Sequence, residues 1–461
     1  MSITRRLCIA AATLSVLALS ACGGSDSGAG DDTITVWTTD TLPDRVAATE
    51  AIIERFTEES GVEVELVGVA EDQFTQTLTS AAAAGELPDV IGSLSLASVR
   101  TLAANDLLDT DAATEVVESL GAETFSEQAL TLTSDGDTQL SVPSDTWSQV
   151  LLYRKDLFEK ADLAAPETYA DIAAAAEELN SGDVAGFVGP TAPADSFTQQ
   201  TFEHIALANG CDLVDDAGEV VLDSPQCVGA FDFYGNLVTD FSIPGAQDVD
   251  TVRAQYFSGK AAMIVWSTFI LDEMAGLRDD ALPSCPECQK DPAFLAENSG
   301  FVTALQGPDG EEPAQFGEVT SWAIPAGSSA DSSKAFVEYF MGDGYVDWIA
   351  IAPEGKFPAR AGTQEQPEEF VDRWAKLPVG VDKKAPLTDF YPPEVIEVLT
   401  SGPDDFDRWG ILEGQGDLVG AILGELPVPQ AVAELAGGET DGQTAAENAA
   451  EKVRSIQESL P

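Results

Sequence analysis

Aromatic rings flanked by hydroxyl, amide and carboxylate groups are the residues of this sequence best suited to bind a ligand. Residues 266–269 (WSTF) set the indole of Trp266 beside two hydroxyls, and residues 144–149 place Trp147 among Ser, Asp and Gln side chains. Rings cover the C–H faces of a sugar, and polar side chains hydrogen-bond its hydroxyl edges. We therefore expect Trp147, Trp266 and Trp322 to stack on such a ligand, with core packing as the alternative for each ring.

Catalysis has little support in the sequence. His204 is the only histidine and lies in an amphipathic segment, so a metal site built from several histidines is excluded and a Ser–His–Asp triad would have to use it. No Gly-x-Ser-x-Gly elbow surrounds a plausible nucleophile. The paired carboxylates of a glycosidase stay open, because 80 Asp and Glu residues offer many pairs. We predict a binding protein and not an enzyme, with no metal and no cofactor.

An alternation of strands and helices positions the first polar candidates. Residues 33–37, 62–69 and 87–92 have strand patterns, and residues 45–60 and 74–84 have helical patterns that end at glycine. This order is typical of a parallel α/β sheet, whose ligand sites lie at the carboxyl ends of the strands. The candidates in the loops after the first and third strands are Thr38, Asp40 and Ser93.

A short buried strand is predicted immediately before Trp266. Residues 259–265 run from a glycine through small and apolar side chains, without the alternation of a half-buried strand. Residues 266–269 would then lie where a buried sheet meets a cleft.

The N-terminus has the pattern of an exported lipoprotein. Arg5 and Arg6 precede the apolar residues 7–19, which are too few to span a bilayer, and LSAC at 19–22 resembles a lipobox. We expect residues 1–21 to be a signal peptide, Cys22 to be lipidated and residues 22–32 to be a flexible tether. An ordinary signal peptide is the alternative, and the arginine pair leaves twin-arginine export open.

Charge and length restrict the remaining possibilities. The formal net charge of −58 argues against nucleic-acid binding, which needs a basic face. The acidic residues are dispersed, as on a solvated surface. About 430 residues beyond the signal are too many for one compact core and predict two or three domains.

Four further cysteines fit an oxidising compartment outside the cytoplasm. Cys211, Cys227, Cys285 and Cys288 form an even set, and proximity in sequence favours the disulfides 211–227 and 285–288. For the CPEC motif at 285–288, a redox pair or half of a zinc site are the alternatives.

Several short segments occur in an order that is typical of one family. They are LPDV at 87–90, VLLYRKDLF at 150–158, GCDLVD at 210–215, LDSP at 222–225, GKAAMIVW at 259–266, WAIP at 322–325 and GKFPAR at 355–360. Together they resemble the sugar-type family 1 of extracellular solute-binding proteins of bacterial ABC importers, the group that includes maltose-binding protein. The resemblance covers residues 33 to about 455. Departures are Cys211 in place of a glycine, residues 320–322 in place of paired glycines, and the insertion that carries Cys285 and Cys288.

This resemblance implies a two-lobe α/β periplasmic-binding-protein fold, type II-like, with discontinuous lobes, a hinge and a ligand cleft between the lobes. The first lobe would comprise residues 33–143 and 267–349, and the second residues 150–266 and 350–461. Family position places further ligand-binding residues in the cleft. With the candidates above, the polar set is Thr38, Asp40, Ser93, Asp145 and Asp195, and a later loop adds Phe357 and Arg360.

The implied function is capture of a small carbohydrate for uptake. The protein would be a monomeric receptor, lipid-anchored to the outer face of the bacterial cell membrane, whose partners are the sugar and the transmembrane subunits of an ABC permease. The alternatives are another polar solute, such as a polyamine or glycerol phosphate, and an exported glycosidase. A cationic ligand would require acids in the cleft, and a phosphate would require Arg residues or helix N-termini.

Overall fold

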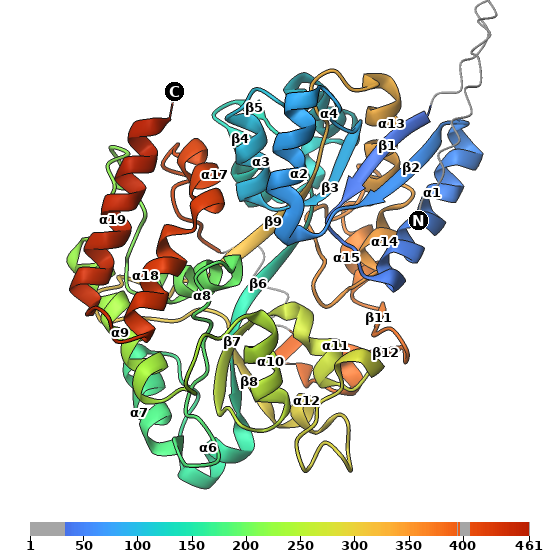
Figure 1. Ribbon diagram of the computed structural model, residues 1–461. Coiled ribbons are helices and arrows are strands. Elements are labelled where there is room, and N and C mark those ends of the chain that lie inside the picture. The colour runs from blue at the N-terminus through green and yellow to red at the C-terminus, as the bar shows by residue number, and fades with distance from the viewer. Residues whose placement is uncertain (1–32, 394, 397–405, 461) are drawn as a thin grey trace, which may run out of the picture.

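Two strands, β6 (Val142–Arg154) and β9 (Gly317–Ala323), cross the middle of the molecule and join its upper and lower halves (Figure 1). The computed structural model describes residues 33–393, 395–396 and 406–460, so the predicted signal peptide, tether and Cys22 lie outside the described residues. β6 serves two groups of strands. Its first half pairs with β9, and its second half pairs with β7 (Met263–Ser267) and β8 (Ser299–Val302).

The upper half contains the parallel α/β unit that the sequence predicts. β1 (Thr33–Thr38) pairs in parallel with β2 (Glu63–Gly68) and with β3 (Val90–Leu94). The connecting helices are α1 (Pro43–Ser60) and α2 (Glu71–Ala84), and each ends at a glycine in the left-handed conformation. β9 runs antiparallel to β3, so the crossing strands continue this sheet and bring the loops after β1 and β3 toward the centre of the molecule.

The buried strand predicted at 259–265 is present as β7, but it begins later, at Met263, and includes Trp266 and Ser267. All of its residues except Ser267 are buried. It runs antiparallel to β6, with Trp266 opposite Val150 and Ser267 opposite Gln149. This register places the two predicted aromatic stretches on neighbouring strands, so Trp147 and Trp266 approach the same region.

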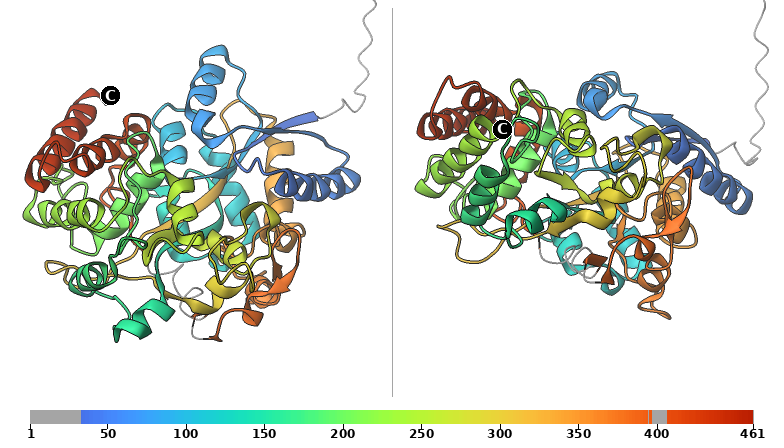
Figure 2. Two further views of the ribbon diagram at one scale, coloured as in Figure 1. Left: turned by 60° about the horizontal axis from the view of Figure 1, so that its bottom comes forward. Right: turned by 90° about the horizontal axis from the view of Figure 1, so that it is seen from below.

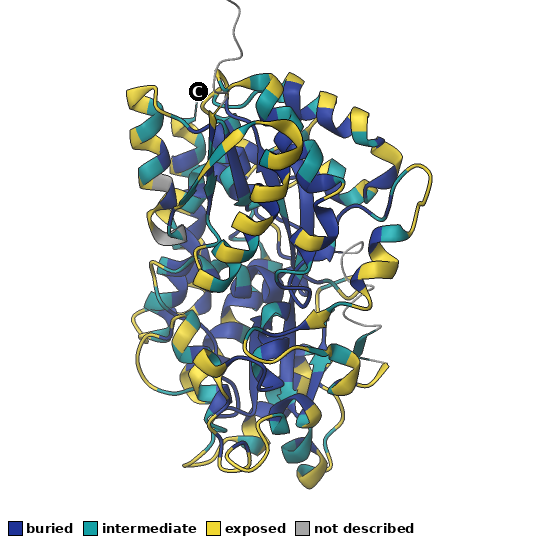
Figure 3. Cartoon of the chain, turned by 90° about the vertical axis from the view of Figure 1, so that its right-hand side faces the viewer, coloured by how far each residue is buried: buried dark blue, intermediate teal, exposed yellow. Residues whose placement is uncertain are grey.

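The remaining elements surround this framework and turn their buried sides toward the strands (Figure 3). The helices are α3 (Leu96–Ala103), α4 (Thr110–Leu120), η1 (Ala122–Thr124), α5 (Glu127–Leu132), α6 (Lys155–Ala161), α7 (Tyr169–Leu179), α8 (Ser196–Leu207), α9 (Pro225–Asp240), α10 (Val249–Phe257), η2 (Thr268–Ile270), α11 (Leu271–Met274), η3 (Asp279–Ala281), α12 (Phe294–Asn298), α13 (Ala330–Met341), α14 (Tyr345–Ile349), α15 (Glu369–Trp374), η4 (Leu387–Asp389), α17 (Gly416–Glu425), α18 (Pro427–Ala436) and α19 (Gly442–Ser459). The short strands are β4 (Ser134–Asp135), β5 (Thr138–Gln139), β10 (Phe357–Pro358), β11 (Pro378–Val379) and β12 (Ala385–Pro386).

The C-terminal helices α17, α18 and α19 gather at one side of the molecule (Figures 1 and 2). α18 and α19 pack against α9, whereas α17 packs against α3 of the upper half. Two glycines permit this close approach. A Cβ on Gly420 would lie 2.7 Å from the backbone N of Thr101, and one on Gly416 would lie 2.7 Å from the Arg100 side chain. Thr101 Oγ1 also donates a hydrogen bond to the Gly420 carbonyl at 3.1 Å.

Both predicted disulfides are present, Cys211–Cys227 and Cys285–Cys288. All four cysteines are buried. Of the described helices, none alone has the length and apolar character to span a membrane, although α17 and α18, bent by 49°, meet that test together.

The glycine contact between α17 and α3 gives a test with a matched control in the same helix. We expect Gly420→Ala to destabilise the protein by about 1–3 kcal/mol, because the added methyl overpacks against the α3 backbone. Gly424→Ala has open space at its Cβ and should instead be neutral or stabilise by up to about 1 kcal/mol. Urea unfolding of both variants measures the difference, and equal effects would contradict the packing argument.

Candidate functional site

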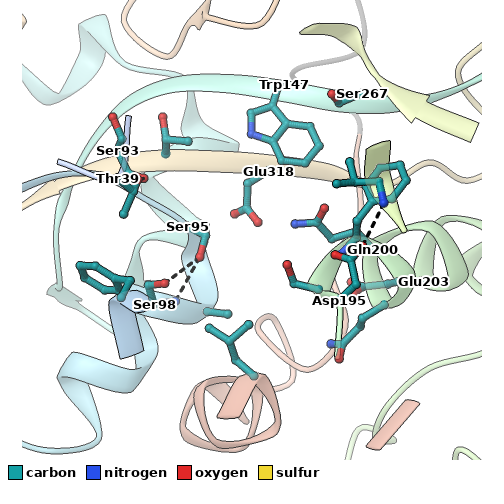
Figure 4. A pocket seen from close by; sticks show the side chains of 18 of the residues that line it. Thr39, Ser93, Ser95, Ser98, Trp147, Asp195, Gln200, Glu203, Ser267 and Glu318 are labelled. Carbon is teal, nitrogen blue, oxygen red and sulfur yellow. Dashed lines mark hydrogen bonds between the residues drawn. The ribbon is translucent and has the colours of Figure 1, made fainter. Parts of the chain in front are cut away.

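A cavity of about 490 Å³ lies between the two halves, beside the crossing strands. Figure 4 shows hydroxyls of Thr39, Ser93, Ser95 and Ser98 on one side and Asp195, Gln200 and Glu203 on the other, with Trp147 and Glu318 between them. Its lining comes from segments that are far apart in the sequence, between Thr39 and Leu426. The lining residues are Thr39, Asp40, Arg45, Phe74, Ser93, Ser95, Ala97, Ser98, Asp145, Trp147, Ala194, Asp195, Ser196, Phe197, Gln199, Gln200, Glu203, Val249, Trp266, Ser267, Phe269, Glu318, Thr320, Lys356, Arg408, Trp409, Val419, Ile422, Leu423 and Leu426.

Trp147 is the ring best placed to contact a ligand. It lines the cavity and is only partly buried, unlike its neighbours on β6. Phe269 and Phe316 support it, with ring centroids 6.4 and 6.0 Å away. Trp266 also lines the cavity, but it is 6% exposed and packs against Phe197 at 4.7 Å, so it contributes mainly an edge.

Ser93 presents a buried hydroxyl without a partner in a strained backbone. Its φ is +58°, which L residues other than Gly, Asn and Asp rarely adopt. The pairing of β3 with β9 shifts register between Ile91 and Leu94, and a bulge of this kind re-aims a side chain. Thr39 Oγ1 donates to the Ser93 carbonyl at 2.9 Å, and the Ser93 Oγ has no hydrogen-bond partner within the protein. A strained residue with an unsatisfied hydroxyl in a cavity is typical of a ligand contact.

The N-terminal end of α8 supplies the opposite wall. Asp195 caps the helix and accepts hydrogen bonds from the backbone N–H groups of Phe197 and Val249, so both carboxylate oxygens are used. Burial raises the pKa of Asp195, and these hydrogen bonds oppose the rise. Gln199 and Gln200 follow one turn later, and the buried Gln199 Oε1 has no partner within the protein. Residues with an unpaired polar atom therefore line the cavity on both sides.

A buried ion network forms one end of the cavity. Arg408 Nε lies 3.1 Å from Glu203 Oε1, and its Nη1 lies 2.9 Å from Glu318 Oε2. Glu318 Oε1 also accepts a hydrogen bond, at 2.9 Å, from the backbone N–H of Leu96, the first residue of α3. Although burial lowers the pKa of Arg408, Glu318 and Glu203 raise it above its usual value. The network joins α8, β9, α3 and the C-terminal segment.

Asp145 is fully buried, and its hydrogen bonds are made within the protein. Oδ1 accepts from Trp348 Nε1 at 3.0 Å and lies 3.6 Å from Lys356 Nζ, while Oδ2 accepts from Thr320 Oγ1 at 2.6 Å. Lys356 also lies over the Trp348 ring at 4.1 Å. The predicted residue borders the cavity, but its carboxylate neutralises a buried lysine.

Four predicted ligand residues are not brought to the cavity. Thr38 is buried in β1, where its hydroxyl accepts from Asp40 N. Trp322 packs among aromatic rings and fills the space over Gly92, where a Cβ would lie 2.2 Å from the indole. Phe357 packs on Trp374, and the guanidinium of Arg360 donates to Thr124 and to two backbone carbonyls. The contacts of each of these four side chains are therefore made within the protein, and none of the four lines the cavity.

The structure brings the other six predicted residues to the cavity: Asp40, Ser93, Asp145, Trp147, Asp195 and Trp266. Sequence reasoning missed several residues that line the cavity beside them. Glu203, Glu318 and Arg408 carry no local signal, because their pairing depends on segments about 90 to 200 residues apart. Leu423 of α17 and Leu426, which follows that helix, were also missed. The predicted amphipathic helix around His204 is present as α8. Burial lowers the pKa of His204 to about 3, and its neutral Nδ1 accepts from the Phe316 N–H.

A cluster of buried carboxyls adjoins the cavity behind Phe269. Glu354 and Asp272 are almost fully buried, and each has one oxygen without a hydrogen-bond partner. Burial, followed by the Asp272 charge, raises the pKa of Glu354 to about 8, and burial raises those of Glu273 and Asp272 to about 7 and 6. The cations that oppose these shifts are Arg45, Arg253, Arg278 and Lys384. Within the described ranges, no group of three or more His, Cys, Asp or Glu side chains is arranged to hold a metal ion.

The Arg408 network predicts a large effect of one substitution. Arg408→Met would leave Glu203 and Glu318 buried without their cation, which should cost about 3–5 kcal/mol of unfolding free energy at pH 7.5. Arg55→Met, which breaks the exposed pair with Asp347, should cost less than about 1 kcal/mol. Urea unfolding compares the two, and a small loss for Arg408→Met would show that the network contributes little.

The carboxyl cluster predicts a loss of stability as pH rises from 6.5 to 8. In this range the folded protein retains the Glu354 proton, whereas the unfolded chain, with an ordinary pKa near 4.5, has released it. The free energy of unfolding therefore falls with rising pH, by up to about 1.4 kcal/mol per pH unit for one proton. Glu354→Gln should flatten this slope in urea unfolding at both pH values, and the exposed control Glu58→Gln should leave it unchanged. An unchanged slope in Glu354→Gln would contradict the assignment.

Known proteins share this architecture. A putative ABC transporter periplasmic-binding protein of Escherichia coli K12, YcjN, is 28% identical over 328 residues, 68% of this chain and 70% of its own. The GacH receptor of Streptomyces glaucescens, solved unliganded and with acarbose, superposes with a TM-score of 0.71 at 21% identity, covering 93% of this chain and 99% of that one. UgpB of Mycobacterium tuberculosis, in complex with glycerophosphocholine, superposes with a TM-score of 0.69 at 17% identity, covering 94% and 99%.

The family assignment follows from the match to a family model and agrees with the geometry. The model for bacterial extracellular solute-binding proteins matches residues 51–379, well over half of the chain. Two lobes joined by crossing strands, with a cavity between them, form the architecture that such proteins use to bind a small molecule for an ABC importer. The chain belongs to the family of bacterial extracellular solute-binding proteins.

Proposed function

We propose that this solute-binding protein captures a neutral carbohydrate and delivers it to an ABC permease. One observation carries the proposal: the half-buried Trp147 ring lines a cavity together with Ser93 and Gln199, each of which has a buried polar atom without a hydrogen-bond partner within the protein. A sugar ring has an apolar C–H face that can stack on the indole, and hydroxyls that can hydrogen-bond to Ser93 and Gln199. The cavity volume of about 490 Å³ has room for a small saccharide.

The charges around the cavity favour a neutral ligand over a phosphate. Three cations line it, and each has a carboxylate within 4 Å: Arg45 with Asp40, Lys356 with Asp145, and Arg408 with Glu203 and Glu318. Five carboxylates against three cations leave the lining negative. An anionic phosphate would have to displace an existing partner from a cation. Glycerol phosphate therefore ranks below a sugar, although the fold is shared with the glycerophosphocholine complex of UgpB.

A polyamine is the second alternative among solutes, because the negative lining would suit a cation. The carboxylates, however, are already hydrogen-bonded: Asp195 by backbone N–H groups and Asp145 by three side chains. A polyamine would also leave the unpaired donor of Ser93 without an acceptor. These features support the carbohydrate over the cation.

Placement in the cell and the division into lobes complete the proposal. We infer that Cys22 is lipidated after removal of residues 1–21, so that the receptor is held at the outer face of the membrane. Residues 350–374, assigned to the second lobe on sequence grounds, contact α14 and η1 of the upper half through Phe370 and Arg360. We propose that this segment moves with the first lobe and that α18 and α19 move with the second.

The proposal is tested by ligand screening on the folded domain from Ser25. A thermal-shift panel of neutral mono- and disaccharides, glycerol phosphate, glycerophosphocholine and spermidine should show stabilisation by a neutral sugar. Trp147→Ala should then weaken the binding of that sugar by about 2 kcal/mol, because the stacking surface is lost. Calorimetry should show this as a rise of roughly 30-fold in Kd. Trp37→Phe, a change outside the cavity, is the matched control. Stabilisation by a phosphate or spermidine alone would overturn the carbohydrate assignment.

A further inference from the structure

We propose that the carbohydrate bound by this protein carries an apolar substituent, and that this group lies against α17. The inference rests on the proposed function and narrows its ligand class to glycosides with an aliphatic or ring-shaped aglycone. Its basis is the chemical division of the cavity. Hydroxyls, amides and carboxylates come from the loop after β1, the end of β3, the start of α3, the crossing strands β6 and β9, and α8, whereas α17 contributes only aliphatic side chains.

The face of α17 that borders the cavity is continuous. Val419, Ile422 and Leu423 follow the spacing i, i+3 and i+4, which places them on one side of the helix, and Leu426 lines the cavity immediately beyond its C-terminal end. The two charged residues of this helix, Asp417 and Glu425, are exposed and do not line the cavity. Phe74 of α2 and Ala97 of α3 extend the same apolar surface. Leu423 and Leu426 are only partly buried, so the surface has room for a contact.

The position of this wall is fixed by the backbone. Gly420 lets α17 lie directly against α3, and its carbonyl accepts a hydrogen bond from Thr101. At its other end, Leu426 has a φ of +48° and is followed by Pro427, the first residue of α18. A leucine rarely adopts this conformation, and strain of this kind is held in place where the surrounding structure requires it. The two leucines are therefore presented to the cavity on a rigid support.

The free-energy cost of desolvation determines which part of a ligand can lie against Leu423 and Leu426. A sugar hydroxyl pressed against Leu423 or Leu426 would lose its hydrogen bonds to water and gain none. An alkyl or ring substituent loses no hydrogen bonds there and gains from apolar burial, about fourfold in affinity for each methylene group. The polar half of the cavity meets the sugar, and the α17 wall meets its substituent.

Paired glycosides test the inference on the intact folded protein. Methyl and hexyl glycosides of glucose, galactose, maltose and cellobiose are titrated by calorimetry, because the pairs differ only in the apolar chain. We expect the hexyl member to bind at least tenfold more tightly than the methyl member for the sugar that binds. Equal binding of both members would overturn the apolar-substituent proposal and leave the carbohydrate function standing. Failure of every sugar and every glycoside would count against both.

Substitutions on α17 locate the preference. Leu423→Asn should remove most of the tenfold difference in affinity between the hexyl and methyl glycosides. Leu423→Met, which keeps an apolar side chain, should retain the preference, and Glu425→Gln on the exposed face should do the same. Each variant is compared by its melting temperature without ligand, so that loss of folding is separated from loss of preference. A preference unchanged in Leu423→Asn would place the apolar contact elsewhere and overturn the role of α17.

Discussion

The buried ion pairs of Arg408 with Glu203 and Glu318 are the constraint on which the site depends. Each charge is almost fully shielded from water, so each is tolerable only when its partners stand at hydrogen-bonding distance. Glu203 belongs to α8, Glu318 to β9 and Arg408 to the C-terminal segment. Because Glu318 also accepts from the N-terminus of α3, a shift of any one segment would leave a charge or a backbone N–H unpaired. The network thus holds the walls of the cavity together in the conformation described.

The ion pairs between lining cations and carboxylates of the protein also limit which ligands the cavity can bind. Arg45, Lys356 and Arg408 all reach the cavity, yet each is directed at a carboxylate of the protein itself. What remains for a ligand is uncharged: a ring on β6, hydroxyls after β1 and β3, amides on α8 and the aliphatic face of α17. The acidity of the chain as a whole, −58, therefore reports on the surface and not on the ligand.

Local sequence patterns predict some of the fold and of the candidate site, but not the residues that come together from distant segments. The strands β1, β2, β3 and β7 and both disulfides could be predicted, because periodicity, glycine ends and short sequence separation express them locally. Trp147 was identified because its neighbours are polar. Trp322 and Arg360 do not line the cavity, and residue type does not reveal that Gly92 leaves space for an indole or that three acceptors enclose a guanidinium. Arg408 and α17 depend on contacts between distant segments, which no local window contains.

Irregular backbone is concentrated where the sheet borders the cavity. β9 shifts register against β3 between Ile91 and Leu94, and against β6 between Pro143 and Asp145. The first shift accompanies the strained Ser93, and the second turns Asp145 toward Lys356 and Trp348. A bulge redirects a side chain that regular alternation would assign to a fixed face of the sheet. Both departures from regular pairing therefore lie beside residues that line the cavity, Ser93 in β3 and Asp145 in β6.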